Sequence, residues 1–172
     1  MRFFWLLCAF WGALGAFDIS NLNVATSGVS GRFVERVELA GLDMNATSKG
    51  RFELKEGALF WRVETPVKTT LKICKEGIFE EIGGAWVKKD ALMDKDIFLA
   101  ITNLDETRLS RDFNLNLSGG EAKWSLSLAP KTIIFKEIFD EIIVEGGETV
   151  QRIIIKAANG DVTTDEFLEV KY

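Results

Sequence analysis

Few residues in this chain are suited to catalysis. The chain contains no histidine, so the most common general base and the most common zinc ligand are both missing. Ser48 precedes Lys49, and Cys74 follows Lys72 and precedes Lys75 at short spacing, so a nucleophile with a lysine partner is conceivable. In a strand, however, the side chains of Ser48 and Lys49 would point to opposite faces. An enzyme therefore ranks behind the two binding functions considered below.

The acidic residues also lack the setting of a catalytic pair. Carboxyl groups can act as general acid or general base in catalysis. Here they lie among charged neighbours, at predicted strand ends or on wet faces, so we interpret them as solvated surface. The residues considered are Glu53, Glu64, Glu80, Glu81, Asp140 and Glu141. We predict no catalytic residue, no metal site and no cofactor.

The first sixteen residues have the pattern of an export signal. Arg2 supplies the positive charge, and the apolar run Phe3–Leu14 is too short to span a bilayer as a helix. Small residues follow, so we expect cleavage near Ala16. A retained anchor helix and a lipidation site at Cys8 are the alternatives. After cleavage Cys74 is the remaining cysteine, which excludes a disulfide within the chain.

Size and charge limit the remaining possibilities. Residues 17–172 are predicted to form a single domain, because this length suffices for one core and not for two. The formal net charge is −5, and the loss of Arg2 with the signal makes it more negative. A nucleic-acid partner is not expected, because phosphates favour a basic surface.

The stretch Thr47–Glu80 predicts adjacent antiparallel strands that share one apolar face. The clearest part is Val67–Ile73, in which every second residue is lysine or threonine. Leu59–Val63 and Phe52–Leu54 alternate in the same way. Glycine at position 57 fits the positive φ that a tight turn needs. Local chemistry alone therefore predicts a meander.

One predicted helix interrupts the strands. In Ala91–Leu104, Met93, Ile97 and Ile101 recur at helical spacing, and Asp90 is placed to cap the N-terminus. We weigh two roles for this helix equally. It is either a permanent cover of the apolar sheet face or a lid that moves when an apolar ligand enters.

Strands also dominate the rest of the chain. Gly31–Leu39 precedes the central stretch, Phe113–Leu128 gives the strongest hairpin pattern, and three further strands are predicted between Ile142 and Val170. Asp105 is placed to cap a short second helix, and the block Thr132–Phe139 fits either a short helix or an irregular strand. The total is about nine to eleven antiparallel strands without βαβ alternation, which favours one curved sheet with α-helical cover.

Curling of this sheet would gather its inward side chains on one concave wall. A single helix covers only part of such a wall, and an acyl chain could cover the rest at about 0.8 kcal/mol per buried methylene. The alternative is that the wall is simply a packed core. The predicted wall consists of Phe52, Leu54, Leu59, Trp61, Val63, Leu71, Ile73, Phe113, Leu115, Trp124, Leu126 and Leu128.

Several short motifs resemble the LolA-like periplasmic carriers of lipoproteins. Ser48–Phe52 is similar to the family's Ser-x-Gly strand, and Leu59–Trp61 with Pro66 is similar to its Phe-x-Trp strand and following proline. The spacing of glycine and apolar residues in Gly31–Leu42 resembles a divergent branch of the family. A tryptophan strand that closes on Leu128–Pro130 is also typical of it.

This resemblance implies an unclosed antiparallel β half-barrel with a helical lid over a hydrophobic cavity. It implies a monomeric carrier without catalytic activity, which binds lipoprotein acyl chains in the periplasm and moves them from the inner to the outer membrane. The implied partners are the acylated cargo, an inner-membrane ATP-driven release transporter and an outer-membrane acceptor. Lys55 takes the place of the family's latch arginine and is a poorer multiple donor. The alternatives are a non-catalytic binding module on the same fold, or a carrier of other acylated or glycolipid cargo.

Overall fold

The computed structural model describes residues 18–42, 44–89 and 95–172 of the chain. The predicted export signal, with its cleavage position near Ala16, lies outside the described residues. So do Asp90, the predicted helix cap, and Met93, the first predicted lid residue.

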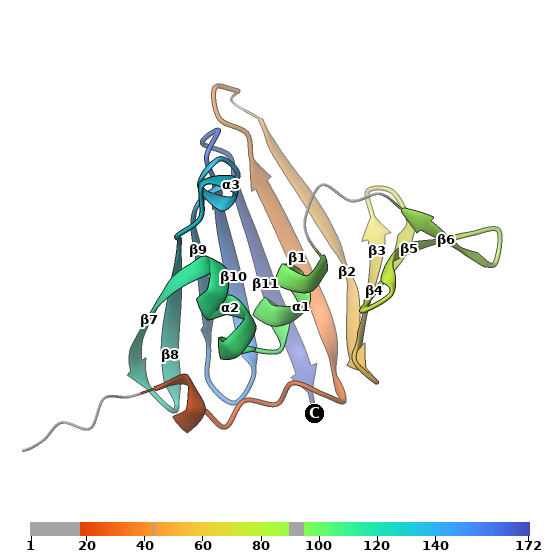
Figure 1. Ribbon diagram of the computed structural model, residues 1–172. Helices are drawn as coiled ribbons and strands as arrows, with labels where there is room; N and C mark the ends of the chain where they lie inside the picture. Colours follow the sequence, from red (N-terminus) through yellow and green to blue (C-terminus); the bar gives the residue numbers. More distant parts are fainter. Residues whose placement is uncertain (1–17, 43, 90–94) are drawn as a thin grey trace, which may run out of the picture.

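A single antiparallel sheet of eleven strands forms the body of the protein (Figure 1). The strand order is β6-β5-β4-β3-β2-β1-β11-β10-β9-β8-β7, so β6 and β7 form the two open edges. The strands are β1 (Val29–Glu38), β2 (Asn45–Lys55), β3 (Ala58–Thr65), β4 (Thr69–Cys74), β5 (Gly77–Ile82), β6 (Ala85–Lys89), β7 (Phe113–Gly120), β8 (Lys123–Pro130), β9 (Phe139–Gly146), β10 (Val150–Ala157) and β11 (Val162–Lys171). This unclosed sheet with helices over one face confirms the predicted fold class.

The alternation in the sequence determines which side chains face inward. In β8, Trp124, Leu126 and Leu128 are buried, while the residues between them are more accessible. The prediction for Val67 was wrong, because its side chain is 71% exposed and β4 begins only at Thr69. The bend after Thr65 includes Pro66 and Val67, so the apolar side chain of Val67 does not indicate a strand position.

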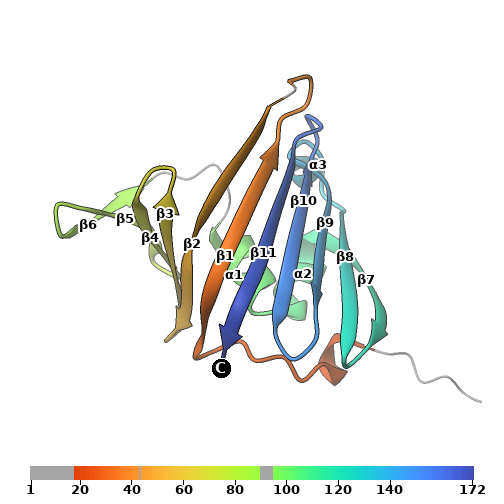
Figure 2. The ribbon, with the colours of Figure 1, turned by 180° about the vertical axis from the view of Figure 1, so that it is seen from behind.

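The chain crosses the concave face between β6 and β7, from one edge of the sheet to the other (Figure 1). This crossing carries α1 (Lys95–Thr102) and α2 (Glu106–Asp112). The cap predicted at Asp105 is present, because its Oδ1 accepts a hydrogen bond from the backbone N–H of Arg108 at 2.9 Å. Seen from behind, the outer face of the sheet carries no helix of the described chain (Figure 2).

The N-terminal segment runs along one end of the sheet. After a 3₁₀ turn, η1 (Ile19–Asn21), the chain continues in extended form to β1. The Ala25 N–H donates to the Glu148 carbonyl, and the Gly28 N–H donates to the Leu54 carbonyl, both at 2.9 Å. These bonds tie the β9–β10 turn and the end of β2 to one segment, which covers this end of the concave face.

The buried apolar residues separate into two clusters. We name each after its tryptophan. The Trp61 cluster contains Val29, Phe33, Phe52, Leu54, Leu59, Trp61 and Ile73, on β1 to β4. The Trp124 cluster contains Ile19, Ile97, Ala100, Ile101, Leu109, Phe113, Trp124, Leu126, Leu128, Phe139, Ile142, Val144 and Ile153, on η1, β7 to β10 and the two crossing helices.

Gly50 permits the close packing behind the Trp61 cluster. A Cβ atom at this position would lie 1.9 Å from the Arg62 carbonyl oxygen and 2.8 Å from the Phe33 ring. The β2–β3 register also shifts between Lys49 and Gly50. We therefore expect Gly50→Ala to lower the free energy of unfolding in urea by about 1–3 kcal/mol.

Gly120→Ala is the matched control for this prediction. Gly120 is also a strand glycine, yet a Cβ there would have no atom within 4 Å, and its φ is not positive. Its substitution should change the free energy of unfolding by less than about 1 kcal/mol. Equal losses in the two variants would show that crowding at Gly50 is not the cause.

Candidate functional site

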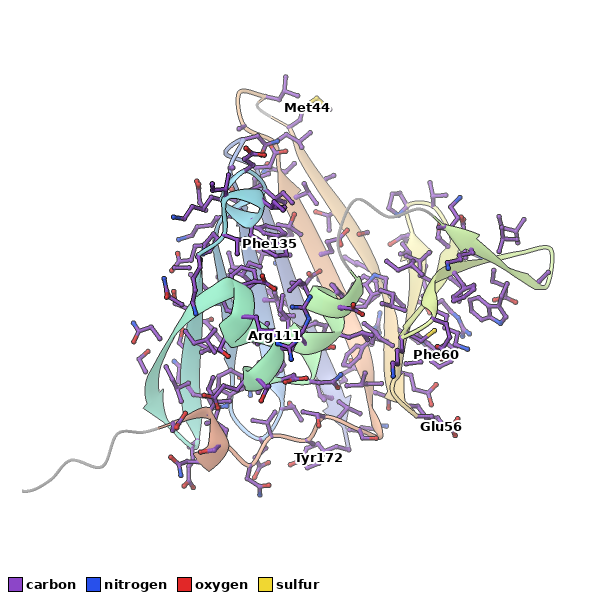
Figure 3. All side chains as sticks on the ribbon, in the orientation of Figure 1. Met44, Glu56, Phe60, Arg111, Phe135 and Tyr172 are labelled. Atoms are coloured by element: carbon purple, nitrogen blue, oxygen red, sulfur yellow. The ribbon has the colours of Figure 1, made fainter. Side chains whose placement is uncertain are left out.

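The candidate site is the aromatic wall of the Trp61 cluster. The Trp61 ring stacks on Phe33 with ring centroids 3.7 Å apart. Phe167 of β11 meets Trp61 and Phe52 edge to face, at centroid distances of 6.1 Å and 4.9 Å. Side chains occupy the space between this wall and the crossing helices (Figure 3). Such aromatic pairs add about 0.5–1.5 kcal/mol each beyond their burial, so the wall is rigid.

The β2–β3 hairpin places the aromatic residues on the same face. Phe52 pairs with Trp61 across the two strands, and Leu54 pairs with Leu59. Directly opposite residues of an antiparallel pair share a face, so these four side chains form one patch. The turn uses Glu56 and Gly57, both with positive φ.

A small apolar cavity lies between this wall and α1. Its volume is about 30 Å³, which is too small for an acyl chain. The hydroxyl group of Thr102, one of the lining residues, donates within α1 to the carbonyls of Phe98 and Leu99. The lining residues are Ala25, Val29, Phe52, Leu54, Leu59, Trp61, Thr102, Val150, Ile153 and Phe167. Ligand pockets usually measure about 300–1,000 Å³, so entry of a ligand requires the elements around this cavity to move apart.

Helix α1 is shared between the two clusters. Ile97 and Ile101 are 0% and 2% exposed and belong to the Trp124 cluster. Phe98 and Leu99 are only partly buried and pack against the Trp61 cluster. The helix therefore turns its fully buried side chains to the Trp124 cluster and its partly buried ones to the aromatic wall.

The predicted wall residues all lie on the concave face, but in two groups. Phe52, Leu54, Leu59, Trp61 and Ile73 belong to the Trp61 cluster, with Val63 and Leu71 packed at its margin. Phe113, Trp124, Leu126 and Leu128 belong to the Trp124 cluster, with Leu115 at its margin. The second group lies beneath α1 and α2, so only the first borders the small cavity.

The predicted lid and latch residues are placed differently from one another. Ile97 and Ile101 lie on the crossing helix, as expected of a lid, but face the Trp124 cluster. Lys55 is exposed, and its ammonium group lies 3.7 Å from the Glu56 carboxylate. Strand alternation puts Lys55 on the face opposite to Leu54, away from α1.

Asp165 is a polar residue of the concave face that the sequence analysis did not single out. It is 6% exposed, and its Oδ1 atom has no hydrogen-bond partner. It pairs across the strands with Glu35, whose Oε1 accepts a hydrogen bond from the Ser48 hydroxyl at 2.6 Å. Burial, and secondarily the Glu35 carboxylate, raise the pKa of Asp165 to about 7. The available signal was Glu35, which interrupts the apolar alternation of β1.

Short helix α3 (Ile133–Lys136) covers the other end of the sheet near β9. The ring of Phe135, labelled in Figure 3, lies 5.3 Å from that of Phe113 and 6.3 Å from that of Phe139. The segment Thr132–Phe139, for which helix and strand were both considered, therefore contains a helix and the first residue of β9. This packing belongs to the Trp124 side and strengthens it.

The β5–β6 hairpin projects from the body of the sheet (Figure 1). Ile82 and Val87 are 51% and 43% exposed, so the inner face of the sheet continues without cover beyond α1. Trp86, on the opposite face, lies edge-on to Phe60 at 6.3 Å. On this inner face Glu80, paired with Lys89 at 3.0 Å, lies between Leu71 and Val87, so the exposed apolar pair is separated from the wall by an ion pair.

The described residues hold no set of metal ligands. No group of three or more His, Cys, Asp and Glu side chains comes together in the described part of the chain. Cys74 is free and buried, and its Sγ lies 3.6 Å from the Gly77 carbonyl oxygen. None of the described helices combines the length and the apolar character needed to cross a membrane.

Comparison with known proteins does not identify a family. No protein-family model matches the chain, and no curated protein matches its sequence. One similar solved structure is a DUF1329 family protein from Desulfovibrio piger ATCC 29098. It is 11% identical, with 86% of each chain covered and a TM-score of 0.43. A similarity this remote supports no argument about function.

Proposed function

We propose that this protein is a periplasmic carrier that binds the acyl chains of lipoproteins and shuttles them from the inner to the outer membrane. The observation that supports the proposal most is the crossing helix α1. It lies on the concave face of an open sheet, and a small cavity lies between it and the aromatic wall. A wall of this kind can exchange one apolar cover for another.

In the proposed mechanism, α1 stays with the Trp124 cluster and leaves the Trp61 cluster. This opening separates Phe98 and Leu99 from the wall, and an acyl chain takes their place. Each buried methylene contributes about 0.8 kcal/mol, so a chain of a dozen carbons offers up to about 10 kcal/mol before the cost of opening. Because one apolar contact replaces another, loading stays reversible, as release to an acceptor requires.

The proposed role needs no chemical step. Its partners would be the acylated cargo, an ATP-driven transporter that releases the cargo from the inner membrane, and an acceptor at the outer membrane. The exposed pair Ile82 and Val87 lies on the inner face at the β6 edge, and the Glu80–Lys89 ion pair separates it from the wall.

The second candidate is a non-catalytic binding module, or a carrier of other acylated or glycolipid cargo, on the same fold. The observation that favours a module without lipid is the cavity volume of about 30 Å³, since the wall is already nearly filled. In that case α1 is a permanent part of the core.

Displacement of an environment-sensitive fluorescent fatty acid tests the carrier proposal. We expect saturable binding to the purified protein and competition by long acyl chains. Phe98→Ala should tighten binding by about 3- to 10-fold, because α1 then leaves the wall at a lower cost. Ile133→Ala is the control, since that side chain is 77% exposed and distant from the cavity lining.

The variants also separate the two candidates. A module with a permanent core predicts no saturable binding by the wild type or by Phe98→Ala. Binding that Phe98→Ala leaves unchanged would place the ligand outside the space that α1 covers.

A further inference from the structure

Asp165 is a neighbour of two residues that line the cavity next to the aromatic wall. On β11 it alternates with Phe167, so both side chains face the concave side. Its cross-strand partners are Glu35 on β1 and Ile153 on β10. Phe167 and Ile153 both line the cavity, so the Asp165 carboxyl group is adjacent to its apolar lining.

This part of the concave face has a shortage of hydrogen-bond donors. Two carboxyl groups, those of Asp165 and Glu35, lie next to each other across a strand pair. The Ser48 hydroxyl donates to the Glu35 carboxylate. The Oδ1 atom of Asp165 has no hydrogen-bond partner, and the residue is only 6% exposed. A buried polar atom without a partner costs about 1–3 kcal/mol, so a ligand that supplies a donor would recover this cost.

We propose that Asp165, Glu35 and Ser48 form a head-group site, which binds a primary ammonium group of an amphiphile whose chain lies on the Trp61 cluster. This inference rests on the proposed function for the placement of the chain. The ammonium group supplies three donors and a positive charge, which suit one unpartnered oxygen and a second carboxylate. An anionic head group would meet two carboxyl groups, so it is disfavoured.

A metal ion fits these residues less well than an ammonium group does. Calcium takes six to eight oxygen ligands, and magnesium requires near-octahedral geometry. The described residues assemble no group of three acidic or other metal-ligating side chains here or elsewhere. An ammonium group needs only the two carboxyl groups and the hydroxyl that are present.

Three amphiphiles with the same twelve-carbon chain test the proposal by displacement of the fluorescent fatty acid. Dodecylammonium has charge and N–H donors, dodecyltrimethylammonium has the charge alone, and dodecanoate has the opposite charge. At about pH 8 we expect dodecylammonium to bind at least about 10-fold more tightly than dodecanoate, with the trimethyl compound between them. Each is used below its micelle concentration.

Asp165→Asn should reduce the preference for dodecylammonium over dodecanoate to less than about 3-fold, because the charge is lost while the shape is kept. Glu166→Gln is the control, since Glu166 is the next residue on the opposite face and pairs with Arg36 at 2.6 Å. In that variant the preference should be unchanged.

The preference should also rise between about pH 6 and pH 8 as Asp165 ionises. The described titratable group that faces Asp165 is Glu35 from β1, while β10 contributes Ile153 and β2 contributes Ser48 beside Glu35. The ammonium of the probe stays charged throughout this range, since such amines have pKa values near 10.

The outcomes distinguish this inference from the proposed function. If none of the three amphiphiles displaces the fluorescent fatty acid and the fatty acid itself does not bind, the carrier proposal fails. If all three bind alike and Asp165→Asn changes nothing, the carrier proposal stands and the head-group site is overturned. If Asp165→Asn binds none of the three amphiphiles and its circular dichroism spectrum is that of an unfolded protein, Glu35→Gln is tested instead. That variant should lower the preference for dodecylammonium over dodecanoate.

Discussion

Asp165→Asn is expected to raise the free energy of unfolding at pH 8 and to leave it nearly unchanged at pH 4. Burial raises the pKa of Asp165 from 3.8 to about 7, so the folded state holds a proton there that the unfolded state has already released. The protein therefore loses stability as the pH rises from about 4 to 7, by about 1.4 kcal/mol per pH unit. Over this window of roughly three units the loss reaches about 4 kcal/mol, which asparagine avoids.

Urea unfolding of the wild type and of Asp165→Asn at about pH 5, 6, 7 and 8 measures this difference. The gap between the two proteins should widen up to about pH 7 and then stay constant. Glu166→Gln is the control. Hydrogen bonding from Arg36 lowers the pKa of Glu166. The contribution of Glu166 to the free energy of unfolding is therefore lost only when the pH falls below the pKa of an ordinary glutamate. A gap between the wild type and Asp165→Asn that is independent of pH would mean that Asp165 is ionised in the folded protein at every pH tested.

Trp124→Ala is expected to lower the free energy of unfolding by about 3–5 kcal/mol. The side chain is 1% exposed, and its indole N–H donates to the Gly147 carbonyl at 2.8 Å. A Cβ at Gly146 would lie 2.6 Å from the indole ring, which shows how closely the β9–β10 turn packs on it. Removal of the ring would leave a cavity and a carbonyl without its donor.

Trp86→Ala is the matched control for this effect. Trp86 lies on β6 and is 44% exposed, with Phe60 as its aromatic neighbour. Its loss should cost less than about 1 kcal/mol, because a half-exposed side chain creates no closed cavity. The midpoints of urea unfolding of the two variants, compared where the dependence of the free energy on urea concentration is the same, measure this difference. A Trp124→Ala protein as stable as Trp86→Ala would contradict the fixed role assigned to the Trp124 cluster.

The two halves of the sheet therefore have different expected tasks. The Trp124 cluster holds α1, α2 and the end near β9, and substitutions there should act on stability. The Trp61 cluster meets α1 only through partly buried side chains, and substitutions such as Phe98→Ala should act on binding. Under the carrier proposal, this separation would let a ligand enter without unfolding the protein.

Much of the fold was predictable from local patterns. The alternation of apolar and polar residues identified the strands and the concave position of Trp61 and Trp124, because side-chain direction in a strand depends only on its two-residue period. Helical spacing identified the crossing helix. Asp105 was predicted as a cap because a short acidic side chain can reach the free N–H groups of the next turn. Val67 shows the limit of this reasoning, since its apolar type cannot reveal that a turn takes it out of the strand.

The sequence by itself determined which face of each strand each residue occupies, and only the tertiary structure decided which strands are neighbours. Alternation carries no information about the partner strand, because pairing depends on contacts between distant segments. The pairing of β11 with β1 brings Asp165 to Glu35, and the crossing between β6 and β7 places α1 between two clusters. The apolar wall was therefore predictable from the residues, whereas its division into the Trp61 and Trp124 clusters, and the pairing of Asp165 with Glu35, arise from long-range packing.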